Sequence, residues 1–335
     1  MRKKFPSGEY ELLAELKDNL NIKNSVWETG IGDDAAVRLC YNEKLIFTAD
    51  TSVENTHFDL NTMCMEEVGY RAMVSNISDC AAMGAVPDSA LIQLVFPDRC
   101  KNIKESIFQL YNGFSKACKK WEFSIVGGDL SVGNQWIIGI TLIGRASVRV
   151  VTRKGIQNGD LLWVSGVPGL SAAGLDALKK WGRKDASALF PTLVNNHVRP
   201  VPQVTLGRIL AENQHVHAMM DLSDGLSKDC ATLAYENNLG LDLETKNIQI
   251  PDTMIQLSKK LGTGWQEWFM HGGEDYHLLY AVSPDLNPKE ICSGVESLYL
   301  GKFTNNHHGV LVCNDAGEYK ELSAGSWDHI NRTGI

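Results

Sequence analysis

The chain has 335 residues, of which 44% are apolar and 21% charged, a composition typical of a globular protein long enough for two domains. Its net charge of −8 argues against a nucleic-acid binder, because such proteins usually carry a basic face, but allows a phosphate-bearing substrate held through cations. The sequence has no membrane-length apolar run, no signal-peptide pattern and no CxxC pair among its eight cysteines, so we expect a cytoplasmic protein that contacts no membrane.

The first half of the chain alternates between strand-like and helix-like segments. Ser7 can cap a helix that carries Leu12, Leu16 and Leu20 on one face. A second helix is expected over 65–83, with Asp79 on it, and a third, amphipathic one over 103–120. Strands are expected at 34–40, 44–50, 90–96, 122–129 and 135–146.

A polar, glycine-bearing break at 147–159 predicts a domain boundary, with an N-terminal domain over 1–147 and a C-terminal domain over 148–335. The second half repeats the alternation of strands and helices. Strands are expected in 161–166, 217–221 and 271–282, and helices in 168–178, 200–212 and 224–238. The fold class is therefore α/β or α+β.

Four short acidic segments are the most informative feature of the chain: 30–37, 48–58, 126–130 and 220–226. Each places one or two aspartates beside glycine or small hydroxyl residues, where a strand ends or a helix begins. A single such aspartate is more often an ordinary cap or turn residue, but the pattern occurs four times. Because gathered carboxylates repel one another unless cations lie between them, the sequence predicts several Mg²⁺ ions beside a polyphosphate.

The common phosphate-binding motifs are absent from the sequence: it contains no P-loop, no GxGxxG after a strand and no protein-kinase HRD and DFG pair. Carboxylates, glycine-turn amides and a few cations remain. Gly128 allows close approach of a nucleotide, and Ser223 begins a helix whose free N–H groups favour phosphate. Arg153 is a candidate for bridging ATP phosphates, although a solvated linker charge is the simpler interpretation.

Three further residues have an ordinary explanation beside a functional one. His57 could contact an anionic substrate, but a lone histidine is more often structural. Glu274 is as well explained by a tight turn as by a ligand. Trp327 could stack on an aromatic ring, although late tryptophans more often attach the tail to the core.

Eight motifs occur in the order found in thiamine-monophosphate kinases, over nearly the whole chain: GIGDDAAV, TADTSVENTHF, GYRAMVSNISDCAAMGAVP, VGGD, TRKG, GVPGLSAAGL, MDLSDGLSKD and GGEDY. The chain thus resembles a family in the aminoimidazole ribonucleotide synthetase-like superfamily. The resemblance implies a two-domain fold whose N-terminal domain forms a homodimer through a shared β-barrel. It also implies direct in-line transfer of the ATP γ-phosphate to thiamine monophosphate with several Mg²⁺ ions. This transfer gives thiamine diphosphate and is the final step of thiamine diphosphate biosynthesis.

The resemblance also assigns roles, none of them as a side-chain acid or base. The implied metal-binding positions are Asp34, Thr48, Ala49 through its main chain, Asp50, Asp79, Asp129, Asp221 and Asp224. The implied ATP contacts are Gly128, Asp129, Arg153 and Ser223, and the implied thiamine monophosphate contacts are His57, Glu274 and Trp327. Leu130 and Ser131 depart from the threonine-rich family pattern after Asp129.

Two alternatives stay open. A sister synthetase would use ATP with another small acceptor, although the chain lacks the early cysteine of selenophosphate synthetases and the cysteine tail of the hydrogenase-maturation proteins. A non-catalytic binding protein of the same fold would have no reason to keep so many carboxylates.

Overall fold

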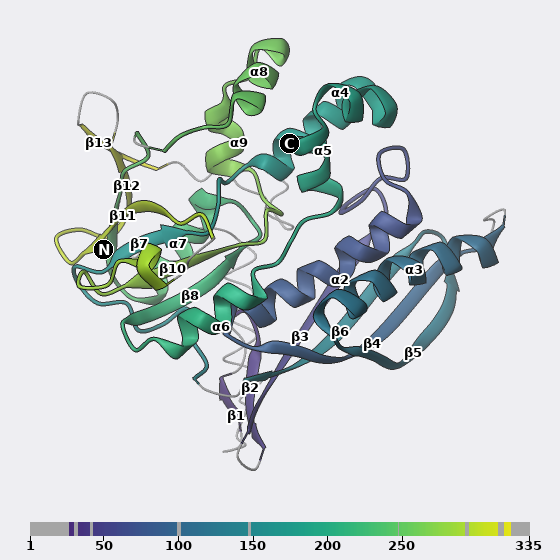
Figure 1. The fold of residues 1–335 in the computed structure, drawn as a ribbon, viewed down its shortest axis with the longest axis horizontal. Helices are drawn as coiled ribbons and strands as arrows, with labels where there is room; N and C mark the ends of the chain where they lie inside the picture. The colour runs from purple at the N-terminus through teal and green to yellow at the C-terminus, as the bar shows by residue number, and fades with distance from the viewer. Residues whose placement is uncertain are drawn as a thin grey trace.

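The computed structural model describes residues 27–29, 33–40, 43–98, 102–146, 149–246, 248–291, 295–313 and 318–322. The helix expected after Ser7 lies outside the described residues, as does Trp327. Figure 1 shows two sheets side by side with helices packed on and between them.

The first sheet has six strands in the order β1-β2-β3-β6-β4-β5, all antiparallel except the parallel pair β4 and β5. The strands are β1 (Trp27–Thr29), β2 (Ala36–Cys40), β3 (Glu43–Val53), β4 (Val86–Pro97), β5 (Ser124–Gly133) and β6 (Ile137–Ala146). Residues alternate between buried and accessible along β4 and β6, as expected for a sheet covered on one face.

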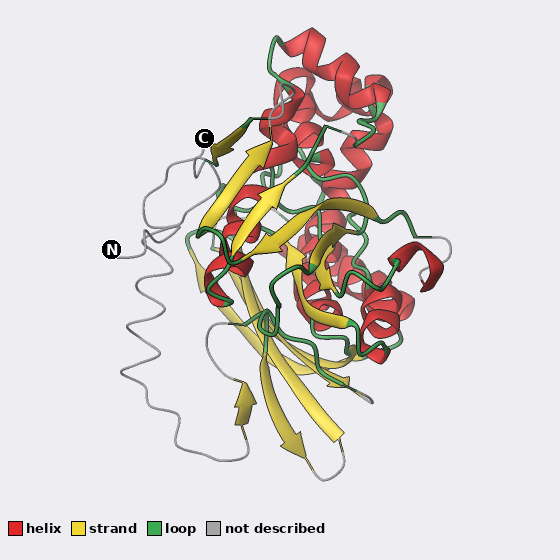
Figure 2. Ribbon diagram, turned by 90° about the vertical axis from the view of Figure 1, so that its left-hand side faces the viewer, coloured by secondary structure: helices red, strands yellow, loops and turns green. Residues whose placement is uncertain are grey.

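Two helices, α2 (Met65–Ala82) and α3 (Ile103–Trp121), cover that face (Figure 2). Helix α2 ends where Gly84 adopts a φ of +72°. The N–H of Ala85 donates to the Cys80 carbonyl, and that of Gly84 donates to the Ala81 carbonyl. This pattern satisfies the last carbonyls of the helix and turns the chain directly into β4.

The second sheet has seven strands in the order β13-β12-β9-β11-β7-β10-β8. They are β7 (Leu161–Val164), β8 (Val216–Leu222), β9 (Gly240–Leu243), β10 (His277–Val282), β11 (Leu298–Thr304), β12 (Gly309–Cys313) and β13 (Tyr319–Glu321). The helices of this half are α4 (Leu170–Leu189), α5 (Pro191–Val198), α6 (Val204–Glu212), α7 (Leu226–Glu236), α8 (Asp252–Leu261), α9 (Trp265–His271) and α10 (Pro288–Ile291).

Helix α2 joins the two halves. It packs on β3, β4 and β6 of its own sheet and on α6, β8 and β10 of the second half. Its side chains are buried nearly all round, including apolar Met73 and Ile77 and polar Asn76 and Ser78. Because α2 contacts both halves, its buried polar residues Asn76 and Ser78 lie at the seam between the halves. The ends of β3 and β8 meet at the same place.

The first sheet keeps one face and two strand edges without partners among the described residues. Leu91, Gln93, Ala49 and Thr51 are exposed on that face. The outer edge of β5 pairs with no described strand, and neither does the outer edge of β3 beyond Phe47, where its pairing with β2 stops. The described strands do not close into a barrel.

The expected strands and helices are confirmed wherever the structure describes them, including the helix over 65–83 and the strand ending at Asp221. The sequence interpretation missed several short elements of the second half, namely α5, α8, α9, β9, β11, β12 and β13.

Candidate active site

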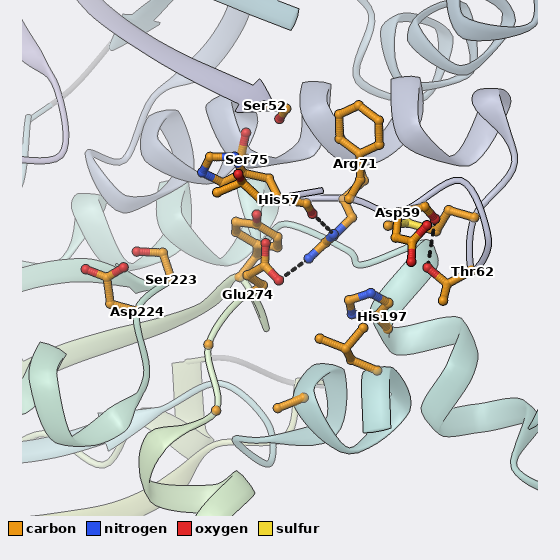
Figure 3. A pocket seen from close by; sticks show the side chains of 18 of the residues that line it. Ser52, His57, Asp59, Thr62, Arg71, Ser75, His197, Ser223, Asp224 and Glu274 are labelled. Carbon is orange, nitrogen blue, oxygen red and sulfur yellow. Dashed lines mark hydrogen bonds and ion pairs between the residues drawn. The ribbon is translucent and has the colours of Figure 1, made fainter. Parts of the chain in front are cut away.

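A cavity of about 1160 Å³ opens at the seam between the halves. The end of β3, helix α2, the N-terminus of α7 and the glycine turn before β10 line it. Figure 3 shows Ser223 and Asp224 on one side of this cavity, His57, Arg71 and Glu274 in the middle, and His197 and Thr62 on the other side. Segments distant in sequence thus supply one continuous wall.

A carboxylate cluster forms one end of the cavity. Asp34, Asp79 and Asp221 each place one carboxylate oxygen within 4.8 Å of the others. Asp34 precedes β2, Asp79 lies on α2 and Asp221 lies near the end of β8. Asp50 and Asp224 line the same cavity beside this group. Three of the four acidic segments, 30–37, 48–58 and 220–226, therefore meet here together with Asp79 of α2, and they contribute five aspartates, three of them from the N-terminal half.

Hydroxyl and amide groups hold these carboxylates in place. The Thr48 hydroxyl donates to Asp79, and the Ser78 hydroxyl donates to Asp221 at 2.7 Å. The backbone N–H of Asp50 donates to the Asn76 side-chain oxygen at 3.2 Å. The two hydroxyl bonds fix the directions of the Asp79 and Asp221 carboxylates and leave their remaining oxygen lone pairs for a ligand, whereas the amide bond fixes the backbone of Asp50.

Burial and mutual repulsion make the cluster hard to ionise without a cation. Burial, followed by the Asp34 carboxylate, raises the pKa of Asp221 to about 8. Burial and the neighbouring Asp50 raise the pKa of Asp79 well above its usual range. Burial also raises the pKa of Asp50, and Asp224 adds to the rise. An all-oxygen set of repelling carboxylates suits a hard divalent cation.

Arg153 compensates part of this charge. Its guanidinium pairs with Asp34, and its backbone N–H lies 3.3 Å and 3.2 Å from the two Asp33 carboxylate oxygens. Although burial alone would lower it, the Asp34 charge raises the pKa of Arg153 above its ordinary value. One Asp34 oxygen, Oδ2, is buried and finds no hydrogen-bond partner among the described residues. A bound cation would satisfy that oxygen.

The N-terminus of α7 carries Ser223 and Asp224 into the cavity. The buried Asp229 carboxylate accepts from the N–H groups of Asp224 and Gly225 at 3.3 Å and 3.2 Å, and Lys228 pairs with Asp224 at 2.7 Å. Sequence reasoning gave Asp33 and Asp229 no role. The doubled acid of DDAA and the last acid of DLSDGLSKD were the available signals.

Arg71 links the two predicted substrate contacts that the structure describes. Its Nη1 donates to the His57 carbonyl at 2.9 Å, and its Nη2 pairs with Glu274. The His57 ring accepts the Val53 N–H at Nδ1, at 3.0 Å. Sequence reasoning missed Arg71, because an arginine inside a helical pattern is normally read as a solvated charge.

The glycine turn that carries Glu274 is strained and anchored. Glu274 and Tyr276 adopt φ values of +63° and +55°, which non-glycine residues rarely adopt. Between them, the buried Asp275 accepts the N–H of Gly169 at 2.6 Å and that of Ser171 at 2.9 Å, at the start of α4. This anchor keeps Glu274 directed at Arg71.

Four of the residues that the family resemblance implies either lie away from the carboxylate cluster or fall outside the described residues. Ala49 is exposed on the opposite side of β3 from Thr48 and Asp50. Gly128 and Asp129 lie on edge strand β5, separated from Asp50 by strands β6 and β4. Three strand spacings amount to about 14 Å. Trp327 lies outside the described residues.

The two-domain fold with a carboxylate-lined seam is the fold of the AIR synthase related proteins. The family model for the N-terminal domain of these proteins matches residues 32–146, and that for the C-terminal domain matches residues 157–314.

Curated relatives and solved structures narrow this class. The thiamine-monophosphate kinase of Bacillus subtilis is 31% identical over 82% of this chain and 83% of its own length. That of Escherichia coli K12 is 30% identical over 96% of this chain and 98% of its own length. A structure of AaThiL complexed with AMPPCP and TMP superposes with a TM-score of 0.83 at 29% identity, covering 96% and 97% of the two chains. The chain therefore belongs to the AIR synthase related family and, within it, to the thiamine-monophosphate kinases.

Family membership confirms the expected two-domain α/β fold.

Proposed function

We propose that this chain transfers the γ-phosphate of ATP to thiamine monophosphate, giving thiamine diphosphate and ADP. Its relatives carry the name of that activity, and a similar structure holds an ATP analogue together with TMP. The observation that carries the proposal for this chain is the buried cluster of Asp34, Asp79 and Asp221 at one end of a cavity that continues to His57 and Glu274.

We further propose that the cluster holds several Mg²⁺ ions. The repelling carboxylates, the all-oxygen donor set and the unpartnered Asp34 oxygen fit such a group. The proposed ligands are Asp34, Thr48, Ala49 through its main chain, Asp50, Asp79, Asp129, Asp221 and Asp224. When bound, Mg²⁺ would align the phosphates and offset the charge on their oxygens.

The chain's own groups position the nucleotide and the acceptor. The start of α7 brings Ser223 and the positive end of the helix dipole to the cavity, and both favour a phosphate oxygen. Arg153, buried beside Asp34, is the proposed guanidinium for the ATP phosphates. The acceptor is a phosphate monoester with a second pKa of about 6, so at neutral pH it is a nucleophile without a general base. Alignment of the two phosphates is therefore the main task of the protein.

The proposed substrate contacts are His57, Glu274 and Trp327. His57 and Glu274 line the middle of the cavity and are joined through Arg71. Trp327 keeps the role that the family resemblance implies. We also retain the proposed division into domains 1–147 and 148–335, with the substrates between them.

We propose that two copies of the chain complete one β-barrel through the uncovered sheets. The unpaired stretch of β3 from 48 to 53 and the outer edge of β5 are two open edges of the described sheet. Joining β5 of one copy to β3 of the other would close the barrel and leave no edge strand. It would also bring Gly128 and Asp129 of one copy beside Asp50 of the other.

A subunit-mixing experiment tests this arrangement. Asp50→Asn and Asp129→Asn should each abolish transfer in a pure homodimer. If the two residues act across the interface, mixed dimers contain one intact site, so an equal mixture regains about a quarter of wild-type activity. Restoration of activity on mixing supports the shared site, and an inactive mixture with verified subunit exchange rejects it.

We propose a cytoplasmic location. The described cysteines Cys40, Cys64, Cys80, Cys118, Cys230 and Cys313 are free thiols, which fits a reducing compartment. Separately, no helix in the described ranges has the length and apolar character to cross a membrane.

The function itself is tested by one assay. Purified protein is incubated with ATP, Mg²⁺ and thiamine monophosphate, and thiamine diphosphate is followed by chromatography. Formation of thiamine diphosphate supports the proposal. ADP release only with a different acceptor would favour a sister synthetase, and tight binding without turnover would favour a binding protein.

A further inference from the structure

The cavity extends well past the carboxylate cluster, and its far end has its own chemistry. Figure 3 shows His197 on α5 facing the guanidinium of Arg71, on the side of the cavity opposite Asp224. Both residues line the cavity. The resemblance to the family gave neither of them a role.

Two buried polar atoms at this far end lack partners. The Arg71 side chain is 6% exposed, and its Nε finds no hydrogen-bond partner among the described residues. His197 is 2% exposed, and its Nε2 is likewise unpartnered in that part of the chain. Buried polar atoms are normally satisfied, so two neighbouring exceptions in one cavity wall indicate groups kept for a ligand.

In the His197 tautomer that carries its proton on Nδ1, the two atoms have opposite hydrogen-bonding character. Burial, followed by the Arg71 charge, lowers the pKa of His197 well below its usual range, so the ring is neutral. Its Nδ1 lies 3.2 Å from the Ser171 hydroxyl. With the proton on Nδ1 and directed at Ser171, Nε2 is an acceptor. The Arg71 Nε–H is a donor in every state.

The ligand at this end follows from the proposed function, on which this step rests. The phosphate of thiamine monophosphate must meet the ATP γ-phosphate beside the carboxylates. The aminopyrimidine ring, at the other end of the molecule, then reaches the far wall. It presents a ring nitrogen that accepts a hydrogen bond beside an exocyclic amine that donates one.

We propose that Arg71 and His197 recognise this aminopyrimidine. The Arg71 Nε–H donates to the ring nitrogen, and His197 Nε2 accepts from the exocyclic amine. Arg71 thereby contacts the substrate directly while it also positions His57 and Glu274. Another polar group of this wall, the Thr62 hydroxyl, already donates to the Asp59 carbonyl at 2.8 Å.

An analogue of the substrate tests the proposal without any mutation. In thiamine monophosphate whose exocyclic amine is replaced by a carbonyl oxygen, the ring nitrogen carries a proton, so donor and acceptor are exchanged. The wild-type enzyme should use this analogue with a kcat/KM at least about a hundredfold lower than that for thiamine monophosphate. Two hydrogen bonds are mispaired, and each mispairing should lower kcat/KM about tenfold. Equal use of both substrates would overturn the subsite.

Two variants test whether His197 and Arg71 cause the preference for thiamine monophosphate over the analogue. His197→Leu and Arg71→Lys should each reduce the preference for thiamine monophosphate about tenfold and leave the KM for ATP unchanged. Arg71→Lys retains the charge opposite Glu274. Thr62→Val is the matched control, and it should keep the wild-type preference because its hydroxyl is already bonded to the protein. Wild-type preference in a folded His197→Leu enzyme would also overturn the subsite.

The results separate the subsite from the proposed function. No thiamine diphosphate from the wild-type enzyme would refute the function itself. Turnover of thiamine monophosphate without discrimination against the analogue would refute only the subsite.

Discussion

At the scale of single residues, the candidate site places a functional group where it costs stability. Asp221 is buried and Asp79 is partly buried beside other carboxylates, while the paired cations of the group are Arg153 on Asp34 and Lys228 on Asp224. Groups chosen for stability alone would not be arranged in this way. Activity and stability should therefore respond in opposite directions when one of them is neutralised.

Asp221→Asn tests that expectation. The amide oxygen still accepts the Ser78 hydroxyl, but the like-charge repulsion is removed. We expect transfer to fall by at least about a thousandfold, and the metal-free protein to gain about 1 kcal/mol of unfolding free energy. Coupled ADP assays and urea unfolding in a chelator measure the two effects. A variant with wild-type turnover would remove Asp221 from the metal site.

Trp327→Ala tests the remaining proposed substrate contact. Loss of ring stacking should raise the KM for thiamine monophosphate about tenfold and leave the KM for ATP nearly unchanged. Steady-state kinetics with each substrate varied in turn separates the two. Equal effects on both values would count against stacking on the thiamine ring.

At the scale of elements, the end of α2 controls how closely the two halves approach. Gly84 has a φ of +72°, and a Cβ added there would lie 2.4 Å from the Ala211 Cβ on α6. Gly262, at the end of α8, has a similar φ of +69° but nothing within 4 Å of an added Cβ. The two glycines therefore share a left-handed backbone conformation, but only at Gly84 would an added Cβ meet a neighbouring helix.

Substitution by alanine at both positions isolates that contact. Gly262→Ala should cost about 1 kcal/mol, the strain of a left-handed residue. Gly84→Ala should cost at least about 1 kcal/mol more, because α6 must move away from α2. Urea unfolding gives both values. Equal losses would mean that the seam tolerates the added methyl group.

The elements also explain what the sequence predicts well. Long periodic segments such as α3 and β6 follow from their hydrophobic patterns, and the acidic segments lie at the ends of strands or the start of a helix. The short elements α5 and β9 carry too few residues for a periodic signal. His197 and Arg71 were missed for a related reason. Their burial depends on the packing of α5 against α2, which joins residues more than a hundred positions apart. The position of Asp129 likewise depends on strand order, which the local sequence does not specify.

At the scale of the whole molecule, the carboxylate cluster should make stability depend on pH and, through the proposed site, on Mg²⁺. Because the folded-state pKa of Asp221 is raised to about 8 and that of Asp33 to about 7, the folded protein holds protons that the unfolded chain releases. Burial is the largest cause for both groups. The metal-free protein should therefore lose stability as the pH rises from about 4 to about 8.

Mg²⁺ should oppose that loss, because its ligands must be deprotonated. We expect a larger rise in Tm at pH 8 than at pH 5, with a gain in unfolding free energy of about 2.7 kcal/mol when Mg²⁺ is a hundredfold above its Kd. Thermal unfolding with and without Mg²⁺ at both pH values measures this. A chelated protein with the same Tm at both pH values, or an equal Mg²⁺ effect, would contradict it.

The open strand edges of the first sheet have a consequence for the newly made protein. A solitary copy offers two rows of free peptide groups and the exposed apolar side chains Leu91, Val126, Leu130 and Val132. Any extended segment in a crowded cell competes for such rows. The proposed pairing of two copies would then cover these edges as well as complete the site. Specific activity should accordingly decline on dilution below the dissociation constant of the proposed dimer.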